Sequence, residues 1–377
     1  MQLTPDFVVI GAGIAGASAA YELAAHGEVL LLERESVAGY HTTGRSAALY
    51  TEVWERGVMR GLTRASRSFL EAPPDGFAEH PVLTPLPVMM IGRADQAHLV
   101  RTLHQDASRY VEASLIGEDV AREWCPLLRP GYVELAVFEP GSRAIDVDAL
   151  HQSFLRGARR RGGTVQLDRG VDRIERNSAG WLVSAGEIEA KTPVVVNAAG
   201  AWCDVVGEMA GVDPIGLVPK RRTAFTFAPP DGVDLSTMPI VIDVAEQFYF
   251  KPEAGQLMGS LAEATPMEPH DVRPEEIDVA RAIERIQAAT VMEIRHVRRT
   301  WAGLRSFVAD GVPVVGEDPS APGFFWLAGQ GGAGIMTSPA MAQTVAGLVT
   351  SGRVPQQLAD NGVDGRLLSV ERLRVGG

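Results

Sequence analysis

Gly11-Ala12-Gly13-Ile14-Ala15-Gly16 is the stretch that decides the fold, because it matches GxGxxG between a predicted strand and a predicted helix. The strand is the β-branched run at 6–10, and the helix is the alanine-rich segment at 17–26. A second buried strand at 28–32 completes a βαβ unit with a right-handed crossover. Glycines at these spacings let a pyrophosphate approach the backbone at the helix N-terminus. The segment therefore predicts a dinucleotide site.

Glu33 ends the second strand, 22 residues after Gly11, where a carboxylate accepts hydrogen bonds from a ribose 2′-hydroxyl. The alternative is that the glycines form an ordinary tight turn. The strand before them, the helix after them and the acidic residue at the expected distance disfavour this alternative. Three further segments rich in small residues, 39–48, 197–202 and 329–335, expose backbone at places far apart in the chain. NAD is bound by the same fingerprint, so these segments are what favour a long, buried cofactor.

Length, charge and cysteine content exclude several classes of protein. A chain of 377 residues fits two domains, and a net charge of −12 disfavours nucleic-acid binding. Two cysteines are too few for a disulfide framework or a zinc site, so a reducing compartment and no metal site are predicted.

The uncharged stretch 319–352 is long enough to span a membrane, but its glycines and Ser338-Pro339 would break such a helix. No integral membrane segment is predicted. We expect a cytoplasmic protein, with peripheral membrane association through a local patch left open.

Two alternating segments indicate an antiparallel sheet with one core face and one face turned towards something polar. Within 220–227 the aromatic residues fall on one face and Arg222 falls on the other. Within 247–251 Tyr249 falls opposite two phenylalanines. Elsewhere the sequence predicts helices and strands more coarsely. Helices are expected at 146–163, with Asp146 as the N-cap, and at 274–294. A buried strand is expected at 191–197, and the region 82–139 shows no clear period.

Several motifs together resemble the D-amino acid oxidase (DAO) family of FAD enzymes. Besides the glycine fingerprint they are Gly44-Arg45-Ser46-Ala47, Asn197-Ala198-Ala199-Gly200, Gly303-Leu304-Arg305 and the Gly-Gln-Gly-Gly segment at 329–332. The resemblance runs along almost the whole chain. The segments 219–225 and 301–307 resemble most closely the branch of bacterial D-arginine dehydrogenases.

This resemblance implies an α/β fold like that of D-amino acid oxidase and glycine oxidase. Residues 1–80, 145–217 and 300–377 would form a discontinuous Rossmann-like FAD-binding domain with a parallel sheet. Residues 81–144 and 218–299 would form a substrate-binding domain built on an antiparallel sheet. The implied cofactor is FAD held without a covalent bond, and the implied partners are a small amino acid and an unidentified electron acceptor. The oligomeric state is not predicted.

The reaction that the resemblance implies is oxidative deamination of a D-amino acid. Hydride transfer from Cα to the flavin would give an imino acid, which hydrolyses to a 2-oxo acid and ammonia. Arg222 and Arg305 would clamp the substrate carboxylate, since a guanidinium is a planar, charged fork for that group, and Tyr249 would donate a further hydrogen bond. The alternatives are surface ion pairs for the arginines and a half-buried sheet residue for Tyr249.

A helix following Gly332 and Gly334 would aim its N-terminus at the flavin, where negative charge develops on reduction. None of the eight histidines stands in a catalytic pattern, so no general base is assigned. The residues expected to bind the cofactor are Gly11, Gly13, Ile14, Ala15, Gly16, Glu33, Arg34, Thr43, Gly44, Arg45, Ser46, Ala47, Val171, Ala199, Gly200, Trp202, Gly303, Gly331, Gly332, Gly334 and Ile335. The residues expected to form the substrate pocket are Leu49, Thr51, Trp54, Val88, Ile240, Ile242, Gly332 and Met336.

Four positions depart from the D-arginine branch, which carries an acidic residue at Val88, His at Leu49, Tyr at Trp54 and Gln at Met336. Burying a substrate guanidinium against Val88 and Met336 without a partner would cost several kcal/mol. We therefore expect apolar or aromatic D-amino acids to be preferred over D-arginine.

Two alternatives to this function stay open. One is a sarcosine-type or D-proline-type secondary-amine oxidase, and the other is a flavin-binding partner subunit without turnover. The chain has only three lysines, so a lysine that activates oxygen is disfavoured and a dehydrogenase is favoured over an oxidase.

Overall fold

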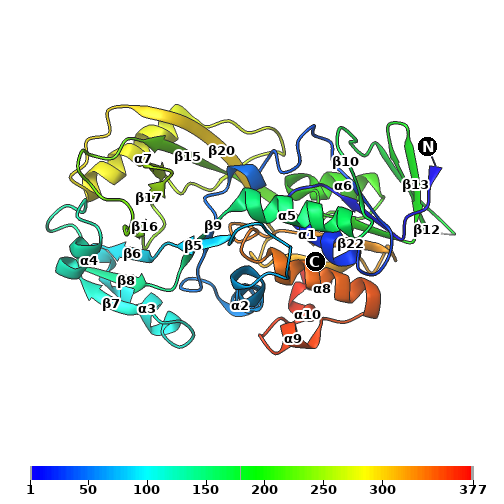
Figure 1. The fold of residues 1–377 in the computed structure, drawn as a ribbon, viewed down its shortest axis with the longest axis horizontal. Coiled ribbons are helices and arrows are strands. Elements are labelled where there is room, and N and C mark those ends of the chain that lie inside the picture. The colour runs from blue at the N-terminus through cyan, green and yellow to red at the C-terminus, as the bar shows by residue number, and fades with distance from the viewer. Residues whose placement is uncertain (1, 179, 375–377) are drawn as a thin grey trace.

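The computed structural model describes residues 2–178 and 180–374, which form two lobes side by side along the long axis (Figure 1). One lobe contains the predicted βαβ unit: β2 (Phe7–Ile10), α1 (Ile14–Leu23) and β3 (Val29–Leu32). Helix α1 begins three residues earlier than the sequence predicts. Gly13 keeps an extended backbone (φ −71°, ψ −176°) as the N-cap, and no side chain caps the helix. The N–H of Ile14, the first residue of the helix, instead donates to Thr43 Oγ1 at 2.9 Å.

Six strands form the central sheet of this lobe, in the order β10-β3-β2-β14-β22-β21. The first five run parallel, and only β21 pairs antiparallel. The added strands are β10 (Thr164–Gln166), β14 (Val194–Asn197), β21 (Val314–Glu317) and β22 (Phe324–Ala328). Alternate residues of β2, β3, β14, β21 and β22 enter two different hydrophobic clusters, so both faces of the sheet are covered, as is usual for parallel sheets.

Helices cover one face of this sheet, and a smaller sheet covers the other (Figure 1). The helical side consists of α1, α2 (Gly57–Glu71), α5 (Val147–Arg160) and α8 (Ser338–Ser351). As predicted, Asp146 caps α5, because its carboxylate accepts a 2.9 Å hydrogen bond from Ala149 N. The opposite side consists of α6 (Cys203–Met209) and a four-stranded sheet of β1 (Gln2–Leu3), β13 (Ile188–Thr192), β12 (Gly180–Ala185) and β11 (Arg173–Asn177).

A nine-stranded sheet forms the second lobe, in the order β19-β15-β18-β17-β16-β6-β8-β7, with β20 pairing β15. It is antiparallel except for one parallel pair, β6 with β16. Its strands are β6 (Val88–Gly92), β7 (Ser114–Gly117), β8 (Leu135–Glu139), β15 (Val218–Phe227), β16 (Ile240–Asp243), β17 (Tyr249–Glu253), β18 (Gln256–Ser260), β19 (Thr265–Pro266) and β20 (Val297–Phe307). The two lobes together give the α/β fold that the sequence predicts.

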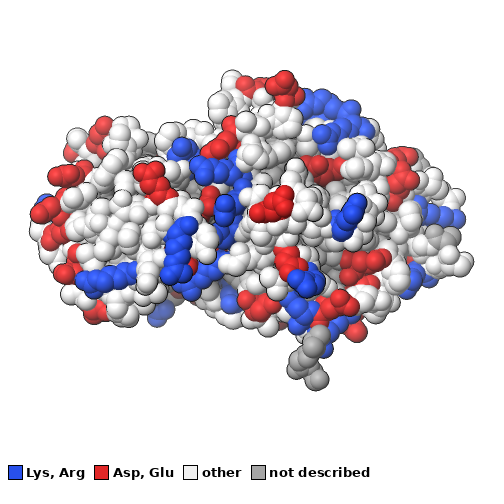
Figure 2. Space-filling view, turned by 90° about the horizontal axis from the view of Figure 1, so that it is seen from below, with Lys and Arg blue, Asp and Glu red and all other residues white. Residues whose placement is uncertain are grey.

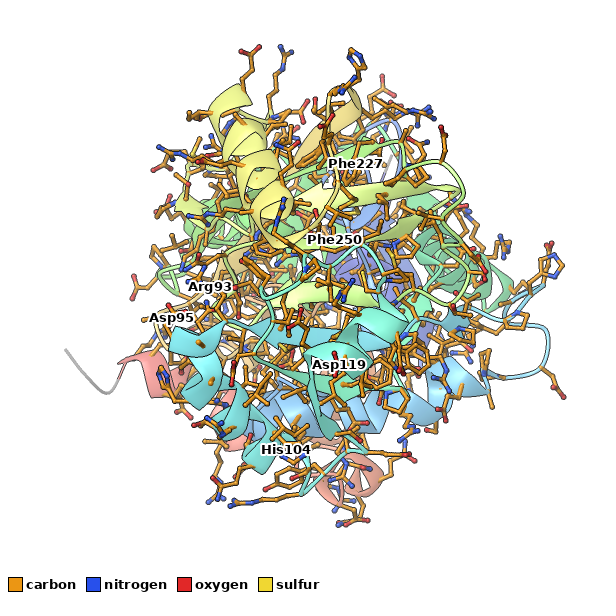
Figure 3. All side chains as sticks on the ribbon, turned by 90° about the vertical axis from the view of Figure 1, so that its left-hand side faces the viewer. Arg93, Asp95, His104, Asp119, Phe227 and Phe250 are labelled. Atoms are coloured by element: carbon orange, nitrogen blue, oxygen red, sulfur yellow. The ribbon has the colours of Figure 1, made fainter. Side chains whose placement is uncertain are left out.

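The two faces of this sheet differ, as the alternation in 220–227 predicts. Phe227 and Phe250 lie on the face covered by α7 (Glu276–Ala289) and α4 (Glu118–Trp124), and both are almost fully buried (Figure 3). The opposite face is only partly covered, by α3 (Ala97–Ala107), and its other part carries Tyr249. Arg93 and Asp95 form an ion pair of 3.1 Å at the edge of this lobe (Figure 3).

Several elements differ from the sequence prediction. The strand expected at 191–197 is two strands in different sheets, β13 and β14, because the chain changes sheet at Pro193. The region 82–139 contains strands and helices too short to show a period, including β5 (Leu83–Pro85) and η2 (Ala94–Gln96). The remaining short elements are η1 (Thr43–Arg45), β4 (Leu49–Tyr50), β9 (Arg143–Ile145), η3 (Gly200–Trp202), α9 (Gln356–Ala359), α10 (Gly365–Leu368) and α11 (Glu371–Arg374).

Arginines of α2 help to join the lobes. Figure 2 shows Lys and Arg gathered in a band across the middle of one face, on the side where α2 lies in Figure 1. Arg60 of α2 is buried; its Nη2 donates to Asp106 of α3 at 2.9 Å, and its guanidinium lies 4.1 Å from the centre of the Tyr110 ring. Such a pair restrains the relative position of α2 and α3.

Within the described ranges, no helix combines the length and apolar character that crossing a membrane requires. Cys125 and Cys203 are both buried free thiols, and burial raises the pKa of Cys125 to about 12. Among residues 2–178 and 180–374, no group of three or more His, Cys, Asp and Glu side chains is placed to hold a metal ion.

Candidate active site and cofactor cleft

A cavity of about 550 Å³ runs along the carboxyl edge of the parallel sheet and reaches the second lobe. The loops after β2, β3, β10, β14 and β22 all line it, together with residues of β15, β17 and β20. Ligands of open α/β sheets bind beyond the carboxyl ends of the strands, so this position is the expected one. Its volume lies in the range typical of ligand and cofactor sites.

The fingerprint glycines are required by close backbone contacts. Gly11 has φ +98°, and a Cβ there would lie 2.7 Å from the carbonyl oxygen of Ala198. A Cβ on Gly16 would lie only 1.8 Å from the carbonyl oxygen of Gly11. Gly16 therefore packs α1 against the loop and does not line the cavity. Gly44 also lies behind the lining, since a Cβ there would be 2.8 Å from the Gly39 carbonyl oxygen. Apart from Gly16 and Gly44, every residue predicted to bind the cofactor lines the cavity.

Glu33 and Arg34 line the end of the cavity beside the fingerprint. The Glu33 carboxylate accepts hydrogen bonds from the backbone N–H groups of Ala12 at 2.7 Å and Glu35 at 3.0 Å. These bonds fix the carboxylate at the mouth of the glycine loop while leaving acceptor lone pairs. The guanidinium of Arg34 lies 5.3 Å from the centre of the Trp202 ring, which also lines the cavity.

Arg222 and Arg305 meet in the cavity because of the strand register. Arg222 on β15 is paired with Gly303 on β20, so Arg305, two residues further along β20, points to the same face as Arg222. Both guanidiniums line the cavity, as does Tyr249 from β17. The neighbouring Arg221 points to the other face, where it forms a buried ion pair with Asp278 of α7 at 2.8 Å.

The two cavity arginines have donors to spare. Arg222 donates from Nε to the Glu263 carbonyl oxygen at 2.6 Å. Within the described part of the chain, its two terminal nitrogens, the Arg305 guanidinium and the Tyr249 hydroxyl make no hydrogen bond or ion pair. Burial and the nearby Arg305 charge lower the pKa of Arg222 to about 10, so it stays charged at neutral pH. Two half-buried cations with free donors form a site for an anion, and their fork geometry suits a carboxylate.

The 329–335 segment closes the cavity over the clamp. Gly331 N donates to the Ser306 carbonyl oxygen at 3.0 Å, and a Cβ on Gly331 (φ +56°) would lie 2.3 Å from the Phe307 ring. The helix expected directly after Gly334 begins later, since α8 starts at Ser338 after a series of turns. Backbone at 331–335, and not the first turn of α8, lines the cavity.

Most residues predicted to form the substrate pocket lie one layer behind the cavity wall. Of the eight, only Gly332 lines the cavity. Five belong to the apolar cluster that also contains Ala224 and Tyr249, namely Leu49, Trp54, Val88, Ile240 and Ile242. Thr51 is buried and donates to the Glu139 carboxylate, while Met336 packs in the core around α8. The five residues of the apolar cluster back the side of the cavity that carries Tyr249.

Sequence reasoning missed several lining residues. Arg169 and Gly170 follow β10, a strand of only three residues, so no pattern marked their position at the sheet edge. Val205 and Met209 come from one face of α6, and their spacing of four residues was the available signal. His41 also lines the cavity, and its Nε2 lies 2.9 Å from Glu35 Oε1.

The residues present fit an extended dinucleotide such as FAD. The N-terminus of α1, the glycine cradle and Glu33 occupy one end of the cavity, and the cavity continues from there to the clamp. A family model described as "DAO: FAD dependent oxidoreductase" matches residues 6–348. The chain belongs to this family. FAD is therefore its cofactor, as the sequence predicts.

Relatives of this FAD-dependent oxidoreductase carry several names. Human mitochondrial sarcosine dehydrogenase is 26% identical over 93% of this chain, but the match covers only 40% of that protein. Glycine oxidase of Bacillus licheniformis is 24% identical, with 93% of this chain and 94% of the relative covered. The chain thus spans about two fifths of the sarcosine dehydrogenase length.

Solved structures show the same fold for this FAD-dependent oxidoreductase. L-proline dehydrogenase from P. horikoshii superposes with a TM-score of 0.86 at 21% identity, covering 100% of this chain and 99% of the other. Glycine oxidase from Geobacillus kaustophilus gives a TM-score of 0.79 at 22% identity, covering 92% and 95%. The DAO family and the glycine oxidase-like fold are confirmed. The narrower placement among D-arginine dehydrogenases stays a prediction.

Proposed function

We propose that this protein oxidises the Cα–N bond of an amino acid whose carboxylate is held between Arg222 and Arg305. The observation that carries this proposal is the pair of guanidiniums with unpartnered donors at the far end of the cofactor cleft. Two charge-assisted forks fix the plane of the carboxylate, and Tyr249 adds a donor on its β17 side. With the carboxylate fixed, Cα–H is held in one orientation. Bound FAD supplies the acceptor for the hydride of that bond.

Among the described residues that line the cavity, no acidic or histidine side chain lies at the clamp. The acidic and histidine side chains that line the cavity within the described ranges are Glu33 and His41. Glu33 is hydrogen-bonded at the glycine loop, and His41 lies against Glu35. The substrate therefore needs to bind with a neutral amine, so that the enzyme has no proton to abstract. The product is an imino acid, which water converts to a 2-oxo acid and ammonia.

We propose that the substrates are apolar D-amino acids. We also propose that the protein is related to the D-arginine dehydrogenase branch. The wall on the Tyr249 side is backed by Leu49, Trp54, Val88 and Ile242, and none of these can pair with a substrate guanidinium. The D configuration rests on the family resemblance. D-leucine, D-methionine and D-phenylalanine should reduce the flavin with a higher kcat/KM than D-arginine.

A secondary amine is the second candidate substrate. The relatives named sarcosine dehydrogenase and dimethylglycine dehydrogenase support it, as does the fold shared with L-proline dehydrogenase. The clamp would serve sarcosine or proline equally well, since it touches only the carboxylate. A dehydrogenase is favoured over an oxidase by the scarcity of lysine, and parallel assays with oxygen and with a redox dye would separate them.

Anaerobic bleaching of the flavin band against D-, L- and N-methyl amino acids tests the proposal. Fastest bleaching by apolar D-amino acids supports it, and fastest bleaching by sarcosine or proline supports the second candidate. If no compound bleaches the flavin, a flavin-binding subunit without turnover is the better description. If Arg222→Ala retains full activity, Arg222 does not hold the substrate carboxylate and the proposed clamp is wrong.

A further inference from the structure

Glu263 lies directly behind the carboxylate clamp, in the connection between β18 and β19. Its carbonyl oxygen accepts from Arg222 Nε at 2.6 Å, and its side-chain Oε1 accepts from the backbone N–H of Thr223. The preceding Ala262 has φ +60°, a left-handed conformation that is strained for alanine and turns the chain at this point. One residue thus holds β15 through both its backbone and its side chain.

The second carboxylate oxygen, Glu263 Oε2, is buried and has no hydrogen-bond partner among the described residues. A buried, unpaired carboxylate oxygen is costly when the group is ionised. Burial accordingly raises the pKa of Glu263, against the opposing effects of its bonds to Thr223 and the charge of Arg222. Burial thus favours the protonated form of this side chain over the ionised form.

The protonation state of Glu263 changes the net charge at the clamp. Arg222 of β15 is the charged side chain that acts on Glu263, and Arg222 is in turn repelled by Arg305 of β20. Tyr249 of β17 and the exposed Glu246 of the β16–β17 turn also face Arg222. With Glu263 ionised the clamp and its support carry one net positive charge, and with Glu263 protonated they carry two.

We propose that Glu263 is a positioning residue whose proton sets the charge of the clamp, and that binding of a substrate carboxylate is coupled to proton uptake by Glu263. The inference rests on the proposed function, because it assumes that Arg222 and Arg305 bind a carboxylate. A bound carboxylate repels ionised Glu263 and favours its protonated form. By linkage, substrate affinity is highest at low pH and falls as pH rises and Glu263 ionises.

Glu263→Gln fixes the uncharged form while keeping an oxygen for the Thr223 N–H. Its dissociation constant for the substrate, taken from anaerobic flavin reduction across about pH 5 to 9, should stay at the low-pH value of the wild type. The wild-type constant should rise about 10-fold over this range after correction for the substrate amine. The limiting rate of reduction should be unchanged. Glu268→Gln removes an exposed carboxylate just after β19 and should behave as wild type. The same pH dependence in Glu263→Gln and wild type would overturn the inference.

Proton uptake gives a second readout that needs neither a variant nor turnover. Acetate, which has a carboxylate and no amine, is added to the weakly buffered holoenzyme, and binding is followed through the flavin spectrum. We expect a fraction of a proton to be taken up per acetate bound, largest near the pKa of Glu263. Acetate binding without proton uptake would overturn the inference and leave the proposed function standing. Proton uptake in a protein that no amino acid reduces would support the inference while the proposed function fails.

Discussion

Arg305 is a residue whose removal should harm activity and not folding. It makes no hydrogen bond or ion pair to any described residue, and its charge is repelled by that of the half-buried Arg222. Arg305→Lys loses the planar fork and at least one charge-assisted bond to the substrate, which is worth roughly 1.5–3 kcal/mol. We expect kcat/KM to fall about 10- to 150-fold, mainly through KM, with an unchanged melting temperature.

The control for Arg305→Lys is Arg299→Lys, on the exposed part of the same strand. The Arg299→Lys substitution should change neither kcat/KM nor the melting temperature. A fall in melting temperature with unaltered KM would mean that Arg305 supports the fold and does not bind substrate.

Glu55 makes stability depend on pH. Burial raises the pKa of this carboxyl from 4.5 to about 7. The hydrogen bond from Trp54 Nε1 and the charge of Arg60 lower the pKa, but their effect is smaller than that of burial. The folded protein therefore binds a proton that the unfolded chain releases between these two values. The free energy of unfolding from this group is fully present below about pH 4.5 and falls as pH rises to 7, by roughly 3 kcal/mol.

Urea unfolding at both ends of this pH window measures the effect. Glu55→Gln should flatten the dependence, whereas Glu71→Gln, which removes an exposed carboxylate of α2, should not. A wild-type protein that becomes more stable over this window would show that Glu55 is ionised in the fold.

At the scale of elements, α1 depends on its contact with the glycine loop. A Cβ on Gly16 would lie 1.8 Å from the Gly11 carbonyl oxygen, and backbone cannot move aside cheaply. Gly16→Ala should cost about 1–3 kcal/mol of stability and reduce the FAD content of the purified protein, because the loop that cradles the pyrophosphate shifts. Gly141→Ala meets nothing within 4 Å and serves as the control. Equal FAD content in both variants would contradict this role for the contact.

The elements that sequence predicts well are those whose information is local. The βαβ unit and the opposite faces of Arg221 and Arg222 follow from spacing alone, and so does the cap of α5 by Asp146. The division of 191–197 into β13 and β14 does not follow from spacing. It depends on the pairing of Thr192 with Trp181 of β12, a contact that tertiary packing sets. Val88 shows the same limit at the site. The sequence predicts that it lines the substrate pocket, whereas packing places it in the apolar cluster with Tyr249, outside the cavity lining.

At the scale of the whole molecule, FAD should join the two lobes. The cavity is lined by five loops of the parallel sheet and by strands of the second sheet, and Arg45 already links them by donating to the Ala302 carbonyl oxygen at 3.0 Å. A ligand at 100 times its dissociation constant stabilises the protein by about 2.7 kcal/mol. We expect FAD to raise the melting temperature and to slow amide hydrogen exchange both at 11–16 and in β15 and β20. Adenosine diphosphate, which lacks the flavin, should protect 11–16 alone. The same exchange experiment tests whether the second sheet takes part in the cofactor site. If FAD protects only the predicted FAD-binding segments 1–80, 145–217 and 300–377, then β15 takes no part in that site.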